Sequence, residues 1–220
     1  MDPIKNGDRV VIKRNIRQDI SDGLNVIIVC LAGAGVYRLL KHMDDENVLV
    51  SSGFANLKYY TSISNILCLA TAILFLVLSV INKRCPILPK LISVSGVGLT
   101  FLVTAVFLAP SHPELNLYVG ANRFFHLWVP IAAMIEFVMF EQDRRMPFKY
   151  TLYTVIPTLL YGLAYLINCL VNGIKTETGT NDWYGFLEWG YPTGILIFAV
   201  LIILNWAIAC LLWFIKSKIK

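Results

Sequence analysis

The sequence predicts an all-α, polytopic membrane protein in which six transmembrane helices form a single bundle. The first observation is composition: of 220 residues, 57% are hydrophobic and only 15% are charged, with a mean hydropathy of +0.65. A soluble domain of this length could not hide so much apolar surface, because polar residues must cover most of its exterior. The second observation is that the apolar residues form long continuous runs. The third is that Lys and Arg are distributed unevenly between the segments that join these runs.

Six apolar runs approach the ~20 residues that a helix needs to cross a membrane. They are Leu24–Leu40, Tyr59–Ile81, Leu88–Ala109, Phe124–Phe140, Leu152–Val171 and Thr193–Ile215. The first and the fourth run are the shortest. No linker, repeat or low-complexity tract separates the runs, so we expect residues 1–220 to form one domain. Residues 1–21 precede the first run as a polar cytoplasmic lead.

The basic residues predict the orientation of the chain. Of 19 Lys and Arg residues, 14 lie before the first run, near the second-to-third and fourth-to-fifth connections, and after the sixth run. The positive-inside rule then places both termini in the cytoplasm, in agreement with an even number of spans. We expect the protein in the cell membrane. The net charge of +5 is therefore a signal of orientation and not of nucleic-acid binding. A cleaved signal peptide over the first run is the alternative, but its removal would leave an odd number of spans.

The five cysteines show no CxxC spacing, and four of them lie within the apolar runs. This placement is typical of small buried hydrophobic residues. We therefore expect no disulfide framework, no metal site and no cofactor. The candidates for chemistry are instead the polar side chains that enter the runs.

Polar side chains open the second run, which begins with the letters KYYTSISN from Lys58 onward. If a helix begins near Tyr59, then Thr61, Ser64 and Asn65 follow the i, i+3, i+4 spacing and share one face. Such residues often form hydrogen bonds with a neighbouring helix or with the carbonyl one turn earlier. Interhelical hydrogen bonding is one interpretation of this face, and a polar site within the membrane is the other.

A single histidine, His126, lies inside the apolar runs, and an ionisable group at membrane depth indicates a function. Lys58 precedes Thr61 by three residues, and Arg123 precedes His126 by three. If both cations lie at the outer headgroups, Thr61 and His126 lie at a similar depth, ~4.5 Å further in. Pro130 cannot donate a hydrogen bond to the carbonyl of His126, so we expect a kink and a freed carbonyl beside the imidazole.

Four further polar residues have less specific interpretations. Glu136 lies ten residues after His126, ~15 Å along a helix, so we expect it to partner a cation or a hydroxyl, or to reach the cytoplasmic interface. Asn205, midway along the sixth run, is predicted to form interhelical hydrogen bonds. Asp182 and Glu188, in the connection before that run, could orient His126 as the third member of a catalytic triad or could be solvated loop acids.

Three short patterns resemble a known family of membrane proteins. They are YYTSISN at the start of the second run, FFHLWVP followed by Glu136 in the fourth, and YGFLEWGYP before the sixth. Together they are similar to the androgen-induced-gene family, whose members are six-span hydrolases of fatty acid esters of hydroxy fatty acids. The resemblance covers about residues 20–215 and is nearer to uncharacterised bacterial relatives. It implies that Thr61 and His126 carry the hydrolysis, and it leaves the exact ester open.

The residue types suit this chemistry. Threonine is a poor nucleophile unless a base takes its proton, and histidine is the usual base near neutral pH. Asn65 or Ser64 could donate hydrogen bonds to the developing oxyanion. The partner would be a membrane lipid or lipid ester that reaches a site in the extracytoplasmic leaflet by lateral diffusion.

Two alternatives stay open on the sequence. A neighbouring serine could be the nucleophile in place of Thr61. The same polar pocket could also belong to a non-enzymatic transporter or lipid-binding protein, because glycines in the first and third runs could interrupt helices there. The two three-span halves show no internal repeat, which disfavours a transporter.

Overall fold

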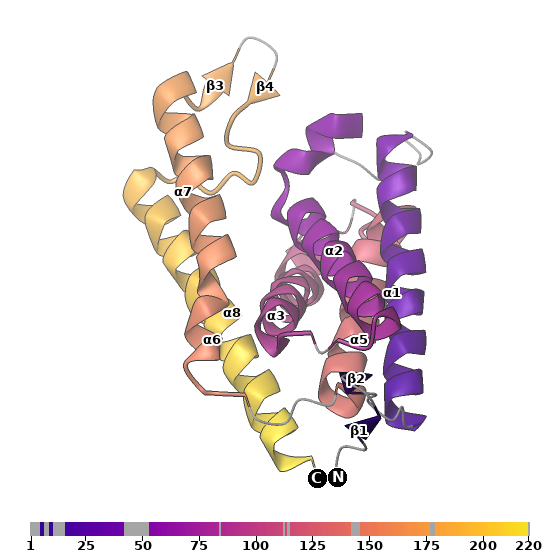
Figure 1. Cartoon of the computed structure of the whole chain (residues 1–220). Helices are drawn as coiled ribbons and strands as arrows, with labels where there is room; N and C mark the ends of the chain where they lie inside the picture. Colours follow the sequence, from indigo (N-terminus) through magenta and orange to yellow (C-terminus); the bar gives the residue numbers. More distant parts are fainter. Residues whose placement is uncertain are drawn as a thin grey trace.

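The computed structural model describes residues 5–6, 9–10, 16–41, 53–83, 85–111, 113, 115–141, 146–176 and 179–219, and it shows a bundle of helices (Figure 1). Most of the predicted polar lead, residues 1–21, lies outside the described residues. Two short antiparallel pairs of strands accompany the helices: β1 (Lys5–Asn6) pairs with β2 (Arg9–Val10), and β3 (Lys175–Thr176) pairs with β4 (Gly179–Thr180).

Within the described residues the helices form six rods. Three rods are single helices: α1 (Ile16–Leu40), α2 (Tyr60–Val80), which follows the short 3-10 helix η1 (Gly53–Lys58), and α8 (Tyr191–Lys218). The other three rods are composite and are numbered in chain order. The third rod joins α3 (Ile87–Val103), the π-helical turn η2 (Thr104–Leu108) and α4 (Ala109–Ser111). The fourth joins the π-helical turn η3 (Phe124–Trp128), α5 (Val129–Ile135) and the π-helical turn η4 (Glu136–Phe140). The fifth joins α6 (Tyr150–Tyr153) and α7 (Val155–Asn172).

Five of the rods are long and apolar enough to cross a membrane, whereas Phe124–Phe140 is apolar but shorter. By helix length and composition, the chain is an integral membrane protein with several spans. The prediction of a mostly helical, multi-pass bundle is thus confirmed. The predicted start of the first run at Leu24 is wrong, because α1 already begins at Ile16. Two of its early polar side chains, Ser21 and Asn25, are buried and form hydrogen bonds with the fourth rod.

The third rod lies at the centre of the bundle and packs against α2, α5 and α8 (Figure 1). In its most apolar stretch of 18 residues 56% of the residues are buried, against 22–28% in the corresponding stretches of the other four long rods. Small residues let neighbouring helices approach it closely. A Cβ atom at Gly98 would lie 3.1 Å from Cγ2 of Ile208 in α8, so the two helices cross closely here and a larger residue would require the Ile208 side chain to shift.

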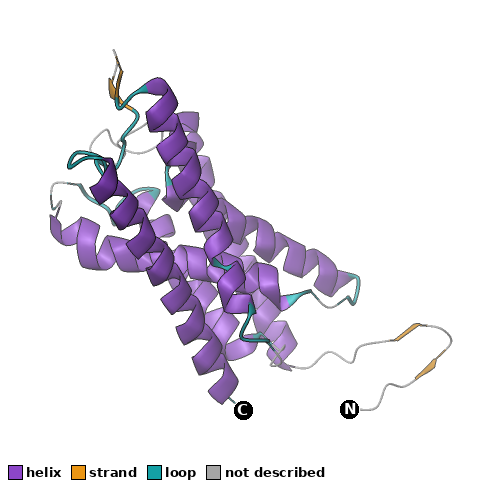
Figure 2. Cartoon of the chain, turned by 90° about the vertical axis from the view of Figure 1, so that its left-hand side faces the viewer, coloured by secondary structure: helices purple, strands orange, loops and turns teal. Residues whose placement is uncertain are grey.

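The two ends of the bundle differ in what they carry. The start of α1 and the end of α8 lie at one end, and η1, the start of α2 and the β3–β4 pair lie at the other (Figures 1 and 2). The residues of the KYYTSISN pattern therefore enter the bundle from the end opposite to the start of α1. Helices α7 and α8 pack against each other beside the central rod.

Asn205 joins α8 to the fifth rod. This rod is interrupted at Thr154, three residues before Pro157, which has no N–H to donate to the preceding turn. The fully buried Asn205 donates from Nδ2 to the carbonyl oxygen of Thr154 (2.8 Å) and to Oγ1 of Thr158 (2.9 Å). The prediction that Asn205 forms interhelical hydrogen bonds is confirmed.

Replacing Asn205 with leucine should destabilise the bundle, because the substitution removes both donors and leaves the Thr154 carbonyl without this partner. We expect Asn205→Leu to lower the free energy of unfolding by about 1 kcal/mol. The measurement is thermal or denaturant unfolding in detergent. The matched control is Asn172→Leu, whose side-chain bond to Asn168 is exposed. Equal losses of stability in the two variants would contradict the interhelical role of Asn205.

Candidate functional site

Asn65 joins the start of α2 to the fourth rod. Its side chain is fully buried, and its Nδ2 donates to the carbonyl oxygen of Thr61 (2.8 Å) and to that of Phe125 (3.2 Å). Thr61 belongs to the first turn of α2, and Phe125 directly precedes His126 in the π-helical turn η3. The hydrogen bonds of one amide therefore place the turn that carries Thr61 against the turn that carries His126. The second and fourth runs are therefore neighbours at this level.

The Phe125 carbonyl in the fourth rod needs a side-chain donor because the backbone hydrogen-bond pattern of this rod changes around Pro130. In the π-helical turn η3 the N–H of Val129 donates to the carbonyl oxygen of Phe124, five residues earlier. The next residue, Pro130, has no N–H to continue this register onto Phe125. Asn65 supplies the donor instead. The sequence predicts the freed carbonyl at His126, whereas the carbonyl that receives a side-chain donor is one residue earlier, because the π turn shifts the register by one.

His126 is buried, with 5% of its surface exposed, and its ring has a defined orientation. Its Nδ1 lies 3.0 Å from the carbonyl oxygen of Leu117, in the segment between the third and fourth rods. Because a carbonyl oxygen can only accept, Nδ1 must carry the hydrogen in this contact. In the neutral ring Nε2 then has the free lone pair, and this nitrogen is the one that can accept a proton.

The two acids considered as partners of His126 interact with, or lie beside, other residues. Asp182 accepts hydrogen bonds from the hydroxyl of Tyr165 and from the backbone N–H of Leu187 (2.9 Å), so it stabilises the segment before α8. Glu188 is exposed and its carboxylate lies beside Gly185. The structure thus replaces the predicted orienting acid by the backbone carbonyl of Leu117.

The two candidate oxyanion donors are also engaged within the protein. Both hydrogens of the Asn65 amide point to backbone carbonyls, as described above. Ser64 Oγ lies 3.1 Å from the carbonyl oxygen of Thr61, to which it can donate, and 3.0 Å from Oγ1 of Thr100. Ser64 and Asn65 therefore position the first turn of α2. The Ser64 hydroxyl and the Asn65 amide thus have acceptors of the protein for their hydrogens, which does not fit the expected oxyanion role.

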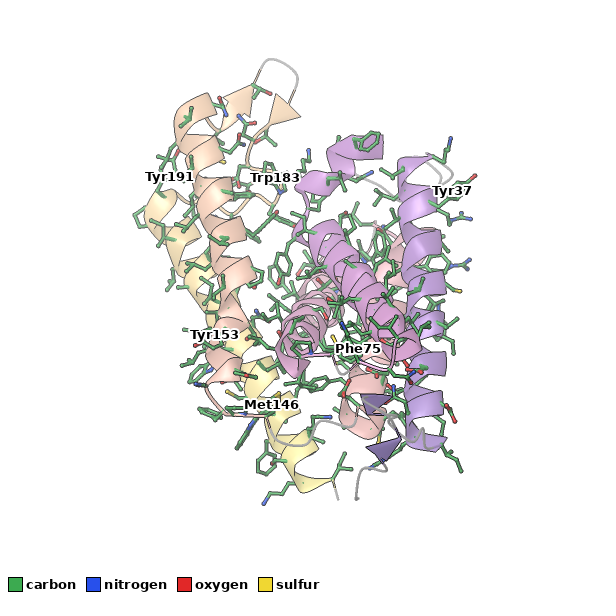
Figure 3. The ribbon with its side chains drawn as sticks, viewed as in Figure 1. Tyr37, Phe75, Met146, Tyr153, Trp183 and Tyr191 are labelled. Carbon is green, nitrogen blue, oxygen red and sulfur yellow. The ribbon has the colours of Figure 1, made fainter. Side chains whose placement is uncertain are left out.

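Aromatic side chains fix the entry of α2, and the sequence did not predict this role. The backbone N–H of Tyr60 donates to the hydroxyl of Tyr184 (2.9 Å), and the hydroxyl of Tyr161 donates to the carbonyl oxygen of Lys58 (2.7 Å). Trp183 donates from Nε1 to the Tyr161 hydroxyl (3.1 Å) and lies between α7 and the start of α2 (Figure 3). Burial raises the pKa of the Tyr184 phenol well above its ordinary value, so this hydroxyl stays neutral.

The candidate site therefore consists of the half-buried Thr61, the buried His126 and the Asn65 amide that ties their backbones together. The site lies at the end of the bundle that carries η1 and the β3–β4 pair (Figure 1). No family model, curated protein or solved structure matches this chain.

Loss of the Asn65 amide should be more damaging than loss of an ordinary polar group in α2. Asn65→Leu leaves the Phe125 carbonyl buried without its donor, and we expect the free energy of unfolding to fall by about 1–3 kcal/mol. The control is Thr71→Val in the same helix, because the Thr71 hydroxyl donates to the carbonyl of Leu67 one turn earlier. Thermal unfolding of both variants in detergent is the measurement. Equal stability of Asn65→Leu and the wild type would contradict the role of the Asn65 hydrogen bonds in joining α2 to the fourth rod.

Proposed function

We propose that this chain is an intramembrane hydrolase of lipid esters, with Thr61 as the nucleophile and His126 as the general base. The observation that carries the proposal is the pair of hydrogen bonds from Asn65, which ties the Thr61 turn to the turn of His126. A second support is the contact of His126 Nδ1 with Leu117, which leaves Nε2 as the basic nitrogen. The resemblance to the androgen-induced-gene family points to the same two residues.

The reaction would proceed through an acyl-enzyme. Nε2 of His126 takes the proton of the Thr61 hydroxyl while Oγ1 attacks the ester carbonyl. The alcohol then leaves with that proton, and the acyl group remains on Thr61. In the second half His126 takes a proton from water, the hydroxide attacks the acyl carbonyl, and the proton returns to Thr61 as the fatty acid departs. No metal or cofactor takes part in these steps.

The first turn of α2 offers donors for the oxyanion in place of Asn65 and Ser64. The first N–H groups of a helix have no carbonyl one turn earlier to which they can donate. In α2 the hydroxyl of Tyr184 accepts from the first of them, that of Tyr60. The next two belong to Thr61 and Ser62, and backbone N–H groups at a helix start suit a developing negative charge. The nucleophile would thus sit beside its own oxyanion donors.

The same arrangement supports a proposal for the placement in the membrane. We propose six spans, with Phe124–Phe140 as the short fourth span, both termini in the cytoplasm and the site in the extracytoplasmic leaflet of the cell membrane. The start of α1 and the end of α8 lie at one end of the bundle, and the candidate site lies toward the other (Figure 1). At ~26 Å, a rod of this length is slightly shorter than the hydrocarbon core. A lipid ester would reach the site by lateral diffusion.

Hydrolysis of lipid esters by the purified protein tests the chemistry. We expect Thr61→Ala and His126→Ala each to lower the rate by about 10²-fold or more, because a nucleophile or a general base is lost. Thr61→Ala should keep the wild-type melting temperature. His126→Ala also removes the donor to the Leu117 carbonyl and should lower it, so its activity is compared well below its own melting temperature. The control is Ser62→Ala, next to Thr61 on a buried part of the same turn.

The outcomes of this assay distinguish the hydrolase hypothesis from its alternatives. Activity that survives Thr61→Ala would reject the nucleophile, and loss of activity only in Ser62→Ala or Ser64→Ala would move that role to the serine. Tight binding of lipid esters without turnover would instead favour a ligand-binding protein or transporter.

Cysteine labelling in intact cells tests the orientation. In a cysteine-free background, Thr176→Cys should react with a membrane-impermeant maleimide added outside, whereas Ser217→Cys should react only after lysis. Both positions are exposed and lie toward opposite ends of the bundle. The native Cys85 is a poor reporter, because burial raises the pKa of its thiol to about 11. The inverse labelling pattern would contradict the proposed placement of the termini.

A further inference from the structure

Glu136 forms a second buried polar cluster, at the end of the bundle away from the candidate site. Glu136 begins the π-helical turn η4, and none of its surface is exposed. Three donors from two other rods converge on its Oε1 atom. They are the hydroxyl of Ser21 (2.5 Å), Nδ2 of Asn25 (3.1 Å) and the ammonium group of Lys90. The proposed hydrolase uses none of these groups.

The remaining side-chain oxygen atoms of Glu136 and Asn25 have no donor among the described residues. Glu136 Oε2 and Asn25 Oδ1 are buried, and neither has a hydrogen-bond partner among the described residues. The orientation of the Asn25 amide is fixed, because its Nδ2 also donates to the carbonyl oxygen of Ser21 (2.8 Å). A buried acceptor without a donor is destabilising, and this cluster has two of them on side chains that are bonded to each other.

Such an asymmetry is expected of a carboxylic acid, although the contact with Lys90 alone would also suit a carboxylate. An ionised carboxylate accepts hydrogen bonds on both oxygens, whereas a neutral acid accepts on its carbonyl oxygen and donates from its hydroxyl. We propose that Glu136 and Asn25 form a buried proton-binding site. The proton is bound to Glu136 Oε2 and donated to Asn25 Oδ1, while Asn25 Nδ2 donates to Glu136 Oε1. The two side chains then form a cyclic acid–amide pair that satisfies all four atoms.

The charges around the pair are compatible with a neutral Glu136. The ammonium group of Lys90 lies 3.2 Å from Oε2 of Glu141 and 3.8 Å from the ring centroid of Phe75, which lies near the central rod (Figure 3). Lys90 therefore has a carboxylate and an aromatic face as partners besides Glu136. This leaves Glu141 as its counterion.

The other titratable groups near the pair have partners of their own or are thiols. Lys216 of α8 donates to the carbonyl oxygens of Phe137 (3.0 Å) and Glu141 (2.8 Å), which close the fourth rod. Asp22 of α1 accepts from the hydroxyl of Ser79 (2.5 Å) and from Gln18. Cys68 of α2 is a buried thiol.

Two glutamine substitutions test the site by their order of stability. Glu136→Gln keeps an acceptor in place of the acid carbonyl and an N–H donor in place of the acid hydroxyl, so its melting temperature should stay close to that of the wild type. Glu141→Gln removes the counterion of Lys90 and should lower the melting temperature more. The reverse order, or a Glu136→Gln protein that does not fold, would overturn the proposal, because Glu136 would then be the ionised partner of Lys90.

Infrared spectroscopy tests the proton directly. Wild-type protein at neutral pH, in a detergent without ester or carboxyl groups, should show the carbonyl stretching band of a protonated carboxylic acid. The band should shift in deuterium oxide and should be missing in Glu136→Gln. Absence of the band from the wild type, or its persistence in Glu136→Gln, would overturn the assignment. The proposal is independent of ester hydrolysis, since neither measurement involves a substrate.

Discussion

The two hydrogen bonds donated by the amide of Asn65 are the interaction on which the candidate site depends. Inside an apolar bundle each backbone carbonyl must find a donor within the protein, because no water is at hand. Pro130 and the π turn before it leave the Phe125 carbonyl to a side-chain donor, and Asn65 provides one from another rod. The same amide bonds the Thr61 carbonyl, so a backbone defect in one rod fixes where the first turn of α2 lies.

At both ends of the bundle buried polar groups find partners within the protein, but the groups that serve as partners differ. At the end of the candidate site, hydroxyl groups of Tyr161 and Tyr184 form hydrogen bonds with the backbone where η1 passes into α2. At the other end, a carboxyl group, an amide and an ammonium group meet around Glu136. The central rod contributes to both ends, with Lys90 beside Glu136 and Thr100 beside Ser64, and its glycines allow the close approach of its neighbours.

The sequence predicts the helical bundle well, because long apolar runs leave few alternatives in a membrane protein. It also predicts that Thr61 and Asn65 share a face, since helical spacing alone determines this. It does not predict the partner of His126, because a backbone carbonyl such as that of Leu117 carries no compositional signal. On the sequence, Lys90 is only one of the basic residues near the second-to-third connection, whereas in the structure it is almost fully buried. Its partner lies in another rod, and sequence separation hides such pairs.

Identification of the residue that reacts with a fluorophosphonate probe is the most direct measurement of whether Thr61 and His126 act together. Such probes form a covalent bond with an activated hydroxyl, and peptide mass spectrometry locates the adduct. The proposed mechanism predicts an adduct on Thr61 in the wild-type protein and none in His126→Ala, since the hydroxyl is not activated without the base. An adduct on another residue, or equal labelling of Thr61 without His126, would contradict the proposed pair.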